Sequence, residues 1–155
     1  MGEDRGKVIM NIKQLFGIIF SCHLLLYGVP LQALPHHPSM VAGQASFSYA
    51  GEQVVNQVTQ QTNRAIINWD GFSVGSNELM QFAHQNPQQM FSTLNRVTGG
   101  NLSEIYGTIS APNGNIYLIN PQGILIGSSG VIHVNSFIAS TLDVNNSAFM
   151  AGRDL

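Results

Sequence analysis

Residues 115–127, NIYLINPQGILIG, hold two short apolar runs joined by a tight turn. Asn120 precedes a proline, which moves it out of the helical region of backbone conformation. Pro121 presets φ for the second turn position, and Asn at the first position with Gly at the fourth completes a type I turn signature. The segment therefore predicts two short strands that meet at Asn120-Pro121-Gln122-Gly123.

The rest of the chain after residue 44 has the same character. Short β-prone runs alternate with Gly, Asn and Pro, and turn signals stand at residues 99–100, 112–114 and 127–130. Residues 77–95 admit partial helical spacing, but Asn86-Pro87 interrupts them, so we expect at most a short helical turn there. The expected strands are Ala45–Tyr49, Gln53–Thr59, Ala65–Trp69, Leu79–Ala83, Ile105–Ile109, Ile116–Ile119, Ile124–Ile126, Val131–Val134 and Phe137–Leu142.

Regular short strands fit a β-sandwich, a β-barrel or a parallel solenoid. The imperfect polar and apolar alternation, the very short strands after residue 116 and the recurrence of Asn at strand ends favour the solenoid. Asn suits a solenoid corner because its side chain bonds neighbouring backbone and forms ladders with equivalent Asn residues. Asn68, Asn115, Asn120 and Asn135 are the candidates.

Charge and side-chain chemistry exclude several functions. Only 9% of residues are charged, no Lys follows Lys13, and three Arg stand against six acidic residues after residue 34. A nucleic-acid partner requires clustered Lys or Arg, so none is expected. His36 and His37 lack further metal ligands nearby in sequence. The scattered carboxylates form no catalytic constellation, so we expect neither an enzyme nor a cofactor.

The N-terminus carries a targeting signal. Lys7 and Lys13 precede the mostly apolar run 15–27, which is too short for a membrane span. We expect a signal peptide over residues 1–33, cleaved between Ala33 and Leu34, with Met1 or Met10 as the true start. Cys22, the single cysteine, is read as part of the signal helix; the alternative is a lipid attachment site.

Five blocks after residue 34 resemble one family when taken in order. They are MVAGQAS (40–46), RAIINWDGF (64–72), FSTLNRVTGGNLSEIYGTIS (91–110), NIYLINPQGILIG (115–127) and VNSFIASTLDV (134–144). Together they resemble the N-terminal secretion domain of filamentous haemagglutinin-type exoproteins, the substrates of two-partner secretion (TPS).

The resemblance implies an all-β fold, a right-handed parallel β-helix with N-terminal capping strands. We therefore expect residues 34–43 to be a spacer and residues 44–155 to be the secretion domain, incomplete at its C-terminus because a solenoid needs a terminal cap.

The family's Asn-Pro turn is implicated in secretion, which makes Asn115, Asn120, Pro121, Gln122 and Gly123 candidates for transporter recognition or for a structural turn. Gln122 departs from the usual motif, which has a second Asn at that position. A second family motif, Asn-Pro-Asn-Leu, is absent, and residues 86–89 (NPQQ) are the nearest string. Trp69, the only Trp, is expected to anchor the cap against the first coils.

By resemblance, the general secretory machinery exports the chain, and an outer-membrane β-barrel transporter with POTRA domains then recognises it. The product would be a secreted or surface-associated adhesin, haemagglutinin-like or contact-dependent toxin-like exoprotein. Its passenger would bind a ligand on a host or neighbouring cell. The alternatives are a self-standing secreted carbohydrate-binding or carbohydrate-cleaving β-helix protein, and a periplasmic lipoprotein anchored at Cys22.

Overall fold

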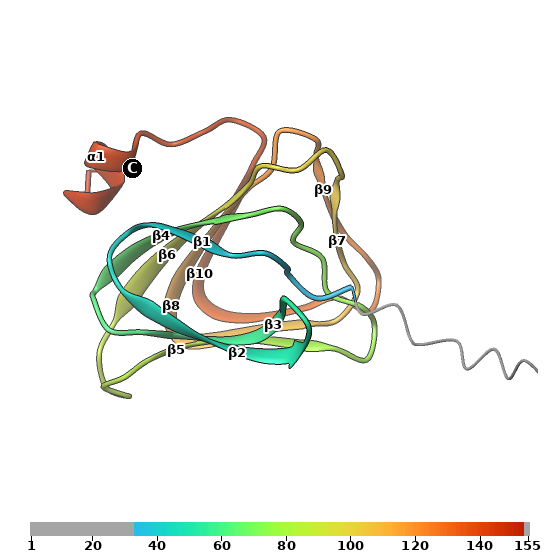
Figure 1. Ribbon diagram of the computed structural model, residues 1–155, viewed down its shortest axis with the longest axis horizontal. Helices are drawn as coiled ribbons and strands as arrows, with labels where there is room; N and C mark the ends of the chain where they lie inside the picture. Colours follow the sequence, from blue (N-terminus) through green and yellow to red (C-terminus); the bar gives the residue numbers. More distant parts are fainter. Residues whose placement is uncertain (1–32, 154–155) are drawn as a thin grey trace, which may run out of the picture. The chain divides into compact units, whose positions relative to one another are not determined.

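A computed structural model describes residues 33–153, which form ten β-strands and one short helix (Figure 1). The predicted signal peptide, apart from Ala33, lies outside the described residues. The elements are β1 Ser39–Ala42, β2 Ala45–Gly51, β3 Val54–Gln60, β4 Arg64–Trp69, β5 Leu79–His84, β6 Phe91–Val97, β7 Ser103–Ile105, β8 Thr108–Ile119, β9 Ile124–Ile126, β10 Val131–Ser140 and α1 Asn146–Met150.

The strands stack in parallel on three faces around one interior (Figure 1). The first face holds β3, β5 and the first halves of β8 and β10. The second face holds β4, β6 and the second halves of β8 and β10, and the third face holds β7 and β9. Each passage through the faces is one coil, and each coil rests on the coil before it. This arrangement confirms the predicted β-solenoid.

Two antiparallel strands begin the fold. β1 pairs with β4, and β2 pairs with β3, so both lie against the first coil as the capping strands that the resemblance implied. Residues 34–43, expected to be a spacer, contribute β1 and a core side chain, since Leu34 is 4% exposed. Pro35 also accepts a hydrogen bond from the Val55 N–H (2.8 Å). The segment therefore combines residues bound to the fold with exposed ones, such as His37 and Val41.

The turn expected at residues 112–114 is a corner inside β8. Pairing of β8 with β5 ends at Ser110, and pairing with β6 begins at Gly114. A Cβ atom on Gly114 would lie 2.7 Å from Ala111 Cβ and 2.8 Å from the Phe91 ring, so any larger residue would force these side chains to shift. β10 crosses the same corner with a register shift between Val134 and Ser136. The two runs predicted at 131–134 and 137–142 are therefore one continuous strand.

No helix forms between residues 77 and 95; the chain turns at Asn86–Gln89 and continues as β6, which the sequence did not predict. β6 lacks simple alternation because both sides of the second face are buried. Phe91 and Val97 belong to the interior core. Leu94 belongs to a second apolar cluster on the outer side, whose buried members are Ile66, Leu94, Tyr117, Ile119 and Phe149.

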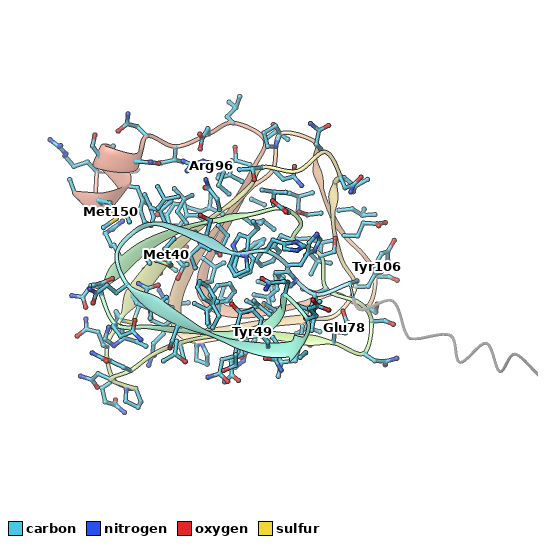
Figure 2. The ribbon with its side chains drawn as sticks, in the orientation of Figure 1. Met40, Tyr49, Glu78, Arg96, Tyr106 and Met150 are labelled. Atoms are coloured by element: carbon cyan, nitrogen blue, oxygen red, sulfur yellow. The ribbon has the colours of Figure 1, made fainter. Side chains whose placement is uncertain are left out.

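The C-terminal segment covers that outer cluster. Arg96 donates hydrogen bonds to Asp143 Oδ1 (2.9 Å), Asn146 Oδ1 (2.8 Å) and the Val144 carbonyl (3.1 Å), and it lies beneath this segment in Figure 2. α1 then places Phe149 edge-to-face on Tyr117, with ring centres 5.2 Å apart. The segment thus closes a sheet face that would otherwise present apolar side chains to water.

Candidate functional site

The turn Asn120–Gly123 joins β8 on the second face to β9 on the third face. The Gly123 N–H donates to the Asn120 carbonyl (3.0 Å), and the Gln122 N–H donates to Asn120 Oδ1 (2.9 Å). Gly123 has φ +115°, a conformation that glycine adopts without strain. Both the backbone and the Asn side chain therefore hold the turn closed, and Pro121 and Gln122 form its exposed tip.

The Asn120 side chain points into the protein. It is 0% exposed, and its Nδ2 donates to the Asn101 carbonyl (3.0 Å) and to Ser103 Oγ (3.0 Å). Asn101 and Ser103 belong to the preceding coil, so this amide links two stacked corners. On the folded surface a partner can reach Pro121 and Gln122 but not the Asn120 amide.

A second Asn-Pro-Gln turn offers an internal comparison. At residues 86–89, the Gln88 N–H donates to Asn86 Oδ1 (3.1 Å) and the Gln89 N–H donates to the Asn86 carbonyl (3.0 Å). The bonding within the turn is the same as at Asn120, but Asn86 is exposed. The two turns share local chemistry and differ in whether the asparagine also joins coils.

Asn115 lies at a different corner from this turn. It is five residues before Asn120 along β8, roughly 16 Å at the rise of a strand. Its Nδ2 donates to Ser92 Oγ (3.3 Å), and its Oδ1 accepts from Asn135 Nδ2 (2.7 Å). The predicted Asn ladder is therefore confirmed at Asn115 and Asn135. Asn120 has the other role expected of these residues, since it bonds neighbouring backbone at its corner. Asn68 instead accepts from Arg96 Nη1 (3.4 Å).

Trp69 lies between the cap and the interior. It is fully buried, and its ring makes edge-to-face contacts with Phe47 of β2 (ring centres 6.0 Å apart) and with Phe72 (5.7 Å). The indole Nε1–H donates to Asn95 Oδ1 (3.0 Å). Asn95 in turn donates from Nδ2 to the Tyr117 carbonyl (3.2 Å). These two hydrogen bonds connect three successive strands of the second face, β4, β6 and β8.

Sequence reasoning missed the buried polar residues of the interior. Asn95, Thr93 and Gln60 are each 0% exposed. Thr93 Oγ1 donates to Gln60 Oε1 (2.7 Å), while Gln60 Nε2 donates to the carbonyls of Thr62 (2.6 Å) and Ser92 (3.2 Å). No local pattern identified them, because Thr93 and Asn95 flank Leu94, an apolar residue that belongs to the outer cluster and not to the interior. Satisfied polar groups of this kind fix the register of a core.

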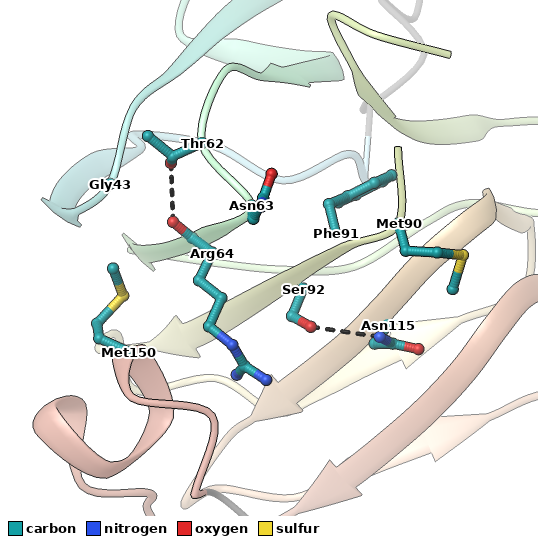
Figure 3. A pocket seen from close by; sticks show the side chains of 9 residues that line it. All are labelled: Gly43, Thr62, Asn63, Arg64, Met90, Phe91, Ser92, Asn115 and Met150. Carbon is teal, nitrogen blue, oxygen red and sulfur yellow. Dashed lines mark hydrogen bonds between the residues drawn. The ribbon is translucent and has the colours of Figure 1, made fainter. Parts of the chain in front are cut away.

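A pocket of about 410 Å³ opens beside α1 (Figure 3). Arg64 projects into it, donates from Nη1 to the Phe149 carbonyl (2.7 Å) and lies 4.9 Å from the centre of the Phe149 ring. These contacts commit Arg64 to holding α1 in place. The lining residues are Gly43, Thr62, Asn63, Arg64, Met90, Phe91, Ser92, Asn115 and Met150.

The predicted cleavage residues lie where the described chain begins. The Ala33 N–H donates to Glu78 Oε1 (3.2 Å), and Leu34 is buried in the core. His36 and His37 pack edge-to-face, and His37 Nδ1 lies 3.4 Å from Asp70 Oδ2. Across residues 33–153, no three His, Cys, Asp or Glu side chains gather closely enough to hold a metal ion. The same residues contain no helix with the length and apolar character needed to cross a membrane.

Comparison with known proteins gives a consistent result. The family model of the TPS secretion domain matches residues 32–155. A heme/hemopexin-binding protein of Haemophilus influenzae strain Rd is 37% identical over 111 residues, covering 72% of this chain and 12% of that protein. A second heme/hemopexin-binding protein of H. influenzae is 32% identical over 110 residues, covering 71% of this chain and 11% of the relative.

One solved structure extends the likeness to the fold. The crystal structure of the HMW1 secretion domain from H. influenzae is 35% identical and superposes with a TM-score of 0.65. The superposition covers 76% of this chain and 30% of that chain. Each of these relatives is thus longer than the region it shares with this chain.

Proposed function

This chain belongs to the family of TPS secretion domains, and on that premise we propose that it directs the export of a longer exoprotein through a dedicated outer-membrane transporter. The family resemblance drawn from the five sequence blocks is confirmed by the match over residues 32–155. The family is one of secretion domains and is generally non-catalytic, which supports a recognition role for this domain. It also favours export over a self-standing carbohydrate-binding or carbohydrate-cleaving protein.

We propose a route in two steps. The general secretory machinery carries the chain across the inner membrane, and a β-barrel transporter with POTRA domains then receives it in the periplasm. The sequence supports passage in an unfolded state, because no cysteine follows Cys22 and no disulfide can lock the chain in the oxidising periplasm. The stacked coils support folding on the far side, since each coil needs only the preceding one to bury its apolar side chains.

The passenger is proposed from the relatives alone. Two relatives are heme/hemopexin-binding proteins, and the matched region is about a tenth of each. We infer a secreted or surface-associated exoprotein with a passenger that binds a ligand, as an adhesin, a haemagglutinin-like protein or a contact-dependent toxin does.

Dependence on the transporter is the direct test. The full chain, expressed in a Gram-negative host with and without the outer-membrane transporter of a TPS system, is expected in the medium only when that transporter is present. Without it, the processed chain should remain in the periplasm. Equal amounts in the medium of both hosts would refute the proposal. A pore-blocked transporter with intact POTRA domains is the matched control for general leakage.

Gln122→Asn is expected to reach the medium at least as efficiently as the parent. Gln122 is exposed at the tip of the turn, and the turn uses its backbone N–H, which the substitution keeps. Asn also restores the commoner family motif at this position. Quantifying the protein in medium and periplasm checks this, with Gln88→Asn at the other Asn-Pro-Gln turn as the control. A fall in secretion for Gln122→Asn alone would show that this chain's transporter requires glutamine.

A further inference from the structure

The first residues of the described chain are built into the fold. Leu34 is 4% exposed within the interior core. The Pro35 carbonyl accepts from the Val55 N–H (2.8 Å), and the His36 N–H donates to the Gly71 carbonyl (3.1 Å). The bond between Ala33 and Leu34 therefore lies at the edge of a segment whose backbone and side chains are already bound.

This placement sets the order of processing and folding. A peptidase must draw the residues around the cleaved bond into its own cleft, and susceptibility follows the burial and hydrogen bonding of that backbone. Once Leu34 is in the core, the bond is held by the protein itself. Removal of the leader must therefore precede the docking of Leu34.

Glu78 is the group that faces this junction. Its Oε2 accepts from the Gly75 N–H (2.7 Å), and the Glu78 N–H donates to the Gly75 carbonyl (2.9 Å), so a local turn orients the carboxylate. Its Oε1 accepts from the Ala33 N–H (3.2 Å). Glu78 lies near the start of the described chain in Figure 2. In the processed chain Ala33 is absent, so Oε1 has no such donor and faces the new chain end.

Cleavage also changes the charge of that end. The Leu34 nitrogen is an amide in the uncut chain and becomes an α-ammonium group in the processed chain. It lies no more than about 3.6 Å from the Ala33 nitrogen, the span of one extended residue. The 3.2 Å bond and this span together place the new positive charge within about 7 Å of a carboxylate oxygen that has no Ala33 partner in the processed chain. An ammonium donor adds the attraction of a full positive charge, which the Ala33 amide lacked.

We propose that Glu78 is the binding site for the α-ammonium group of the processed N-terminus, which locks the capping segment in place after the leader is removed. The proposal rests on cleavage at Ala33–Leu34 and on the secretion function proposed above. Its ligand is the chain's own new terminus, so the site is complete only in the exported form.

The sequence makes this site unusually easy to probe. No Lys follows Lys13, so the processed chain has one primary amine, its α-amino group. An amine-acetylating reagent, followed by hydroxylamine to remove hydroxyl esters, neutralises that charge alone. Glu78→Gln removes the charge of the partner. Glu104→Gln is the matched control, because Glu104 lines the neighbouring pocket with Ala33 and Gly75 but makes no hydrogen bond to Ala33.

The experiment uses the processed chain purified from the periplasm, each variant with and without acetylation. Intact mass should show Leu34 as the first residue. Acetylation is expected to lower the melting temperature of the parent and of Glu104→Gln by about 3–5 °C, and to leave Glu78→Gln unchanged. The amine of native Glu78→Gln should also react faster than that of the native parent, with the two rates equal in urea.

Equal losses of melting temperature in the parent and in Glu78→Gln would place the ammonium group elsewhere and overturn the proposal. So would no loss in either protein, or a first residue other than Leu34. Since leader removal and periplasmic purification need no outer-membrane transporter, these outcomes are independent of the test of secretion.

Discussion

Trp69→Ala is expected to lower the free energy of unfolding by about 3–5 kcal/mol, the usual cost of truncating a fully buried aromatic residue. The substitution removes the ring that joins Phe47 of the cap to Phe72 of the interior. It also leaves Asn95 Oδ1 without its indole donor. Urea unfolding followed by circular dichroism measures the effect. Tryptophan fluorescence is unsuitable, because Trp69 is the only tryptophan and the variant lacks it.

Trp69→Phe separates the two contributions. Phenylalanine keeps an aromatic ring between Phe47 and Phe72 but lacks the N–H, so a loss of about 1–3 kcal/mol is expected from the unpaired Asn95 oxygen. If the free energy of unfolding of Trp69→Ala lies within about 1 kcal/mol of the parent's, roughly the contribution of one hydrogen bond, the cap does not depend on this side chain. The anchoring role of Trp69 is then wrong.

Asn120→Ala is expected to destabilise the fold by about 1–3 kcal/mol and to reduce the amount of protein in the medium. The variant loses the side-chain bond of the turn and keeps the backbone bond. It also leaves the buried Ser103 Oγ and the Asn101 carbonyl without this donor. Inner-membrane export and leader removal should proceed normally, so the processed chain accumulates in the periplasm. Urea unfolding and the ratio of protein in medium and periplasm are the two measurements.

Two control variants separate folding from recognition. Asn86→Ala removes the equivalent bond in an exposed turn, and its cost should stay at or below about 1 kcal/mol. Ser103→Ala removes one link between coils and leaves the turn intact. If secretion falls in the same proportion to the loss of free energy of unfolding in Ser103→Ala and in Asn120→Ala, Asn120 acts through the fold. A loss of secretion in Asn120→Ala that exceeds this proportion indicates that the transporter recognises Asn120 in the unfolded chain.

Most strands were predictable because turn residues mark their limits. β2, β3, β4, β5 and β9 fall close to the predicted runs, since Gly, Asn and Pro end each run wherever the solenoid turns a corner. β6 was not predicted because both of its sides pack against apolar clusters, one inside the solenoid and one under α1. A strand buried on both sides does not show the polar and apolar alternation that identifies a half-exposed strand.

The candidate site was predictable in its backbone and not in its environment. Asn120-Pro121-Gln122-Gly123 dictates a turn through local bonds alone. The acceptors of the Asn120 amide lie 17 and 19 residues earlier, and only stacking of the coils brings them near. The five-residue helix α1 is equally non-local, because its position depends on Arg64, 85 residues before Phe149. No local pattern records such pairings.

The contact between Arg64 and Phe149, 85 residues apart in sequence, affects the order in which the domain folds. Neighbouring coils of the second face pair across fewer than thirty residues, as Arg64 with Ser92 and Ser92 with Asn115. Phe149 packs on Tyr117 of a later coil and also reaches back to Arg64 of the first one. A chain that folds from its N-terminus therefore forms the outer side of the second face early and covers it only after residue 149 is in place. Until residue 149 arrives, Ile66, Leu94 and Tyr117 form a bare apolar stripe on an otherwise charge-poor protein. Packing of α1 onto the second face thus conceals an exposed apolar surface, and a chain arrested before that step is expected to aggregate more readily than the closed form.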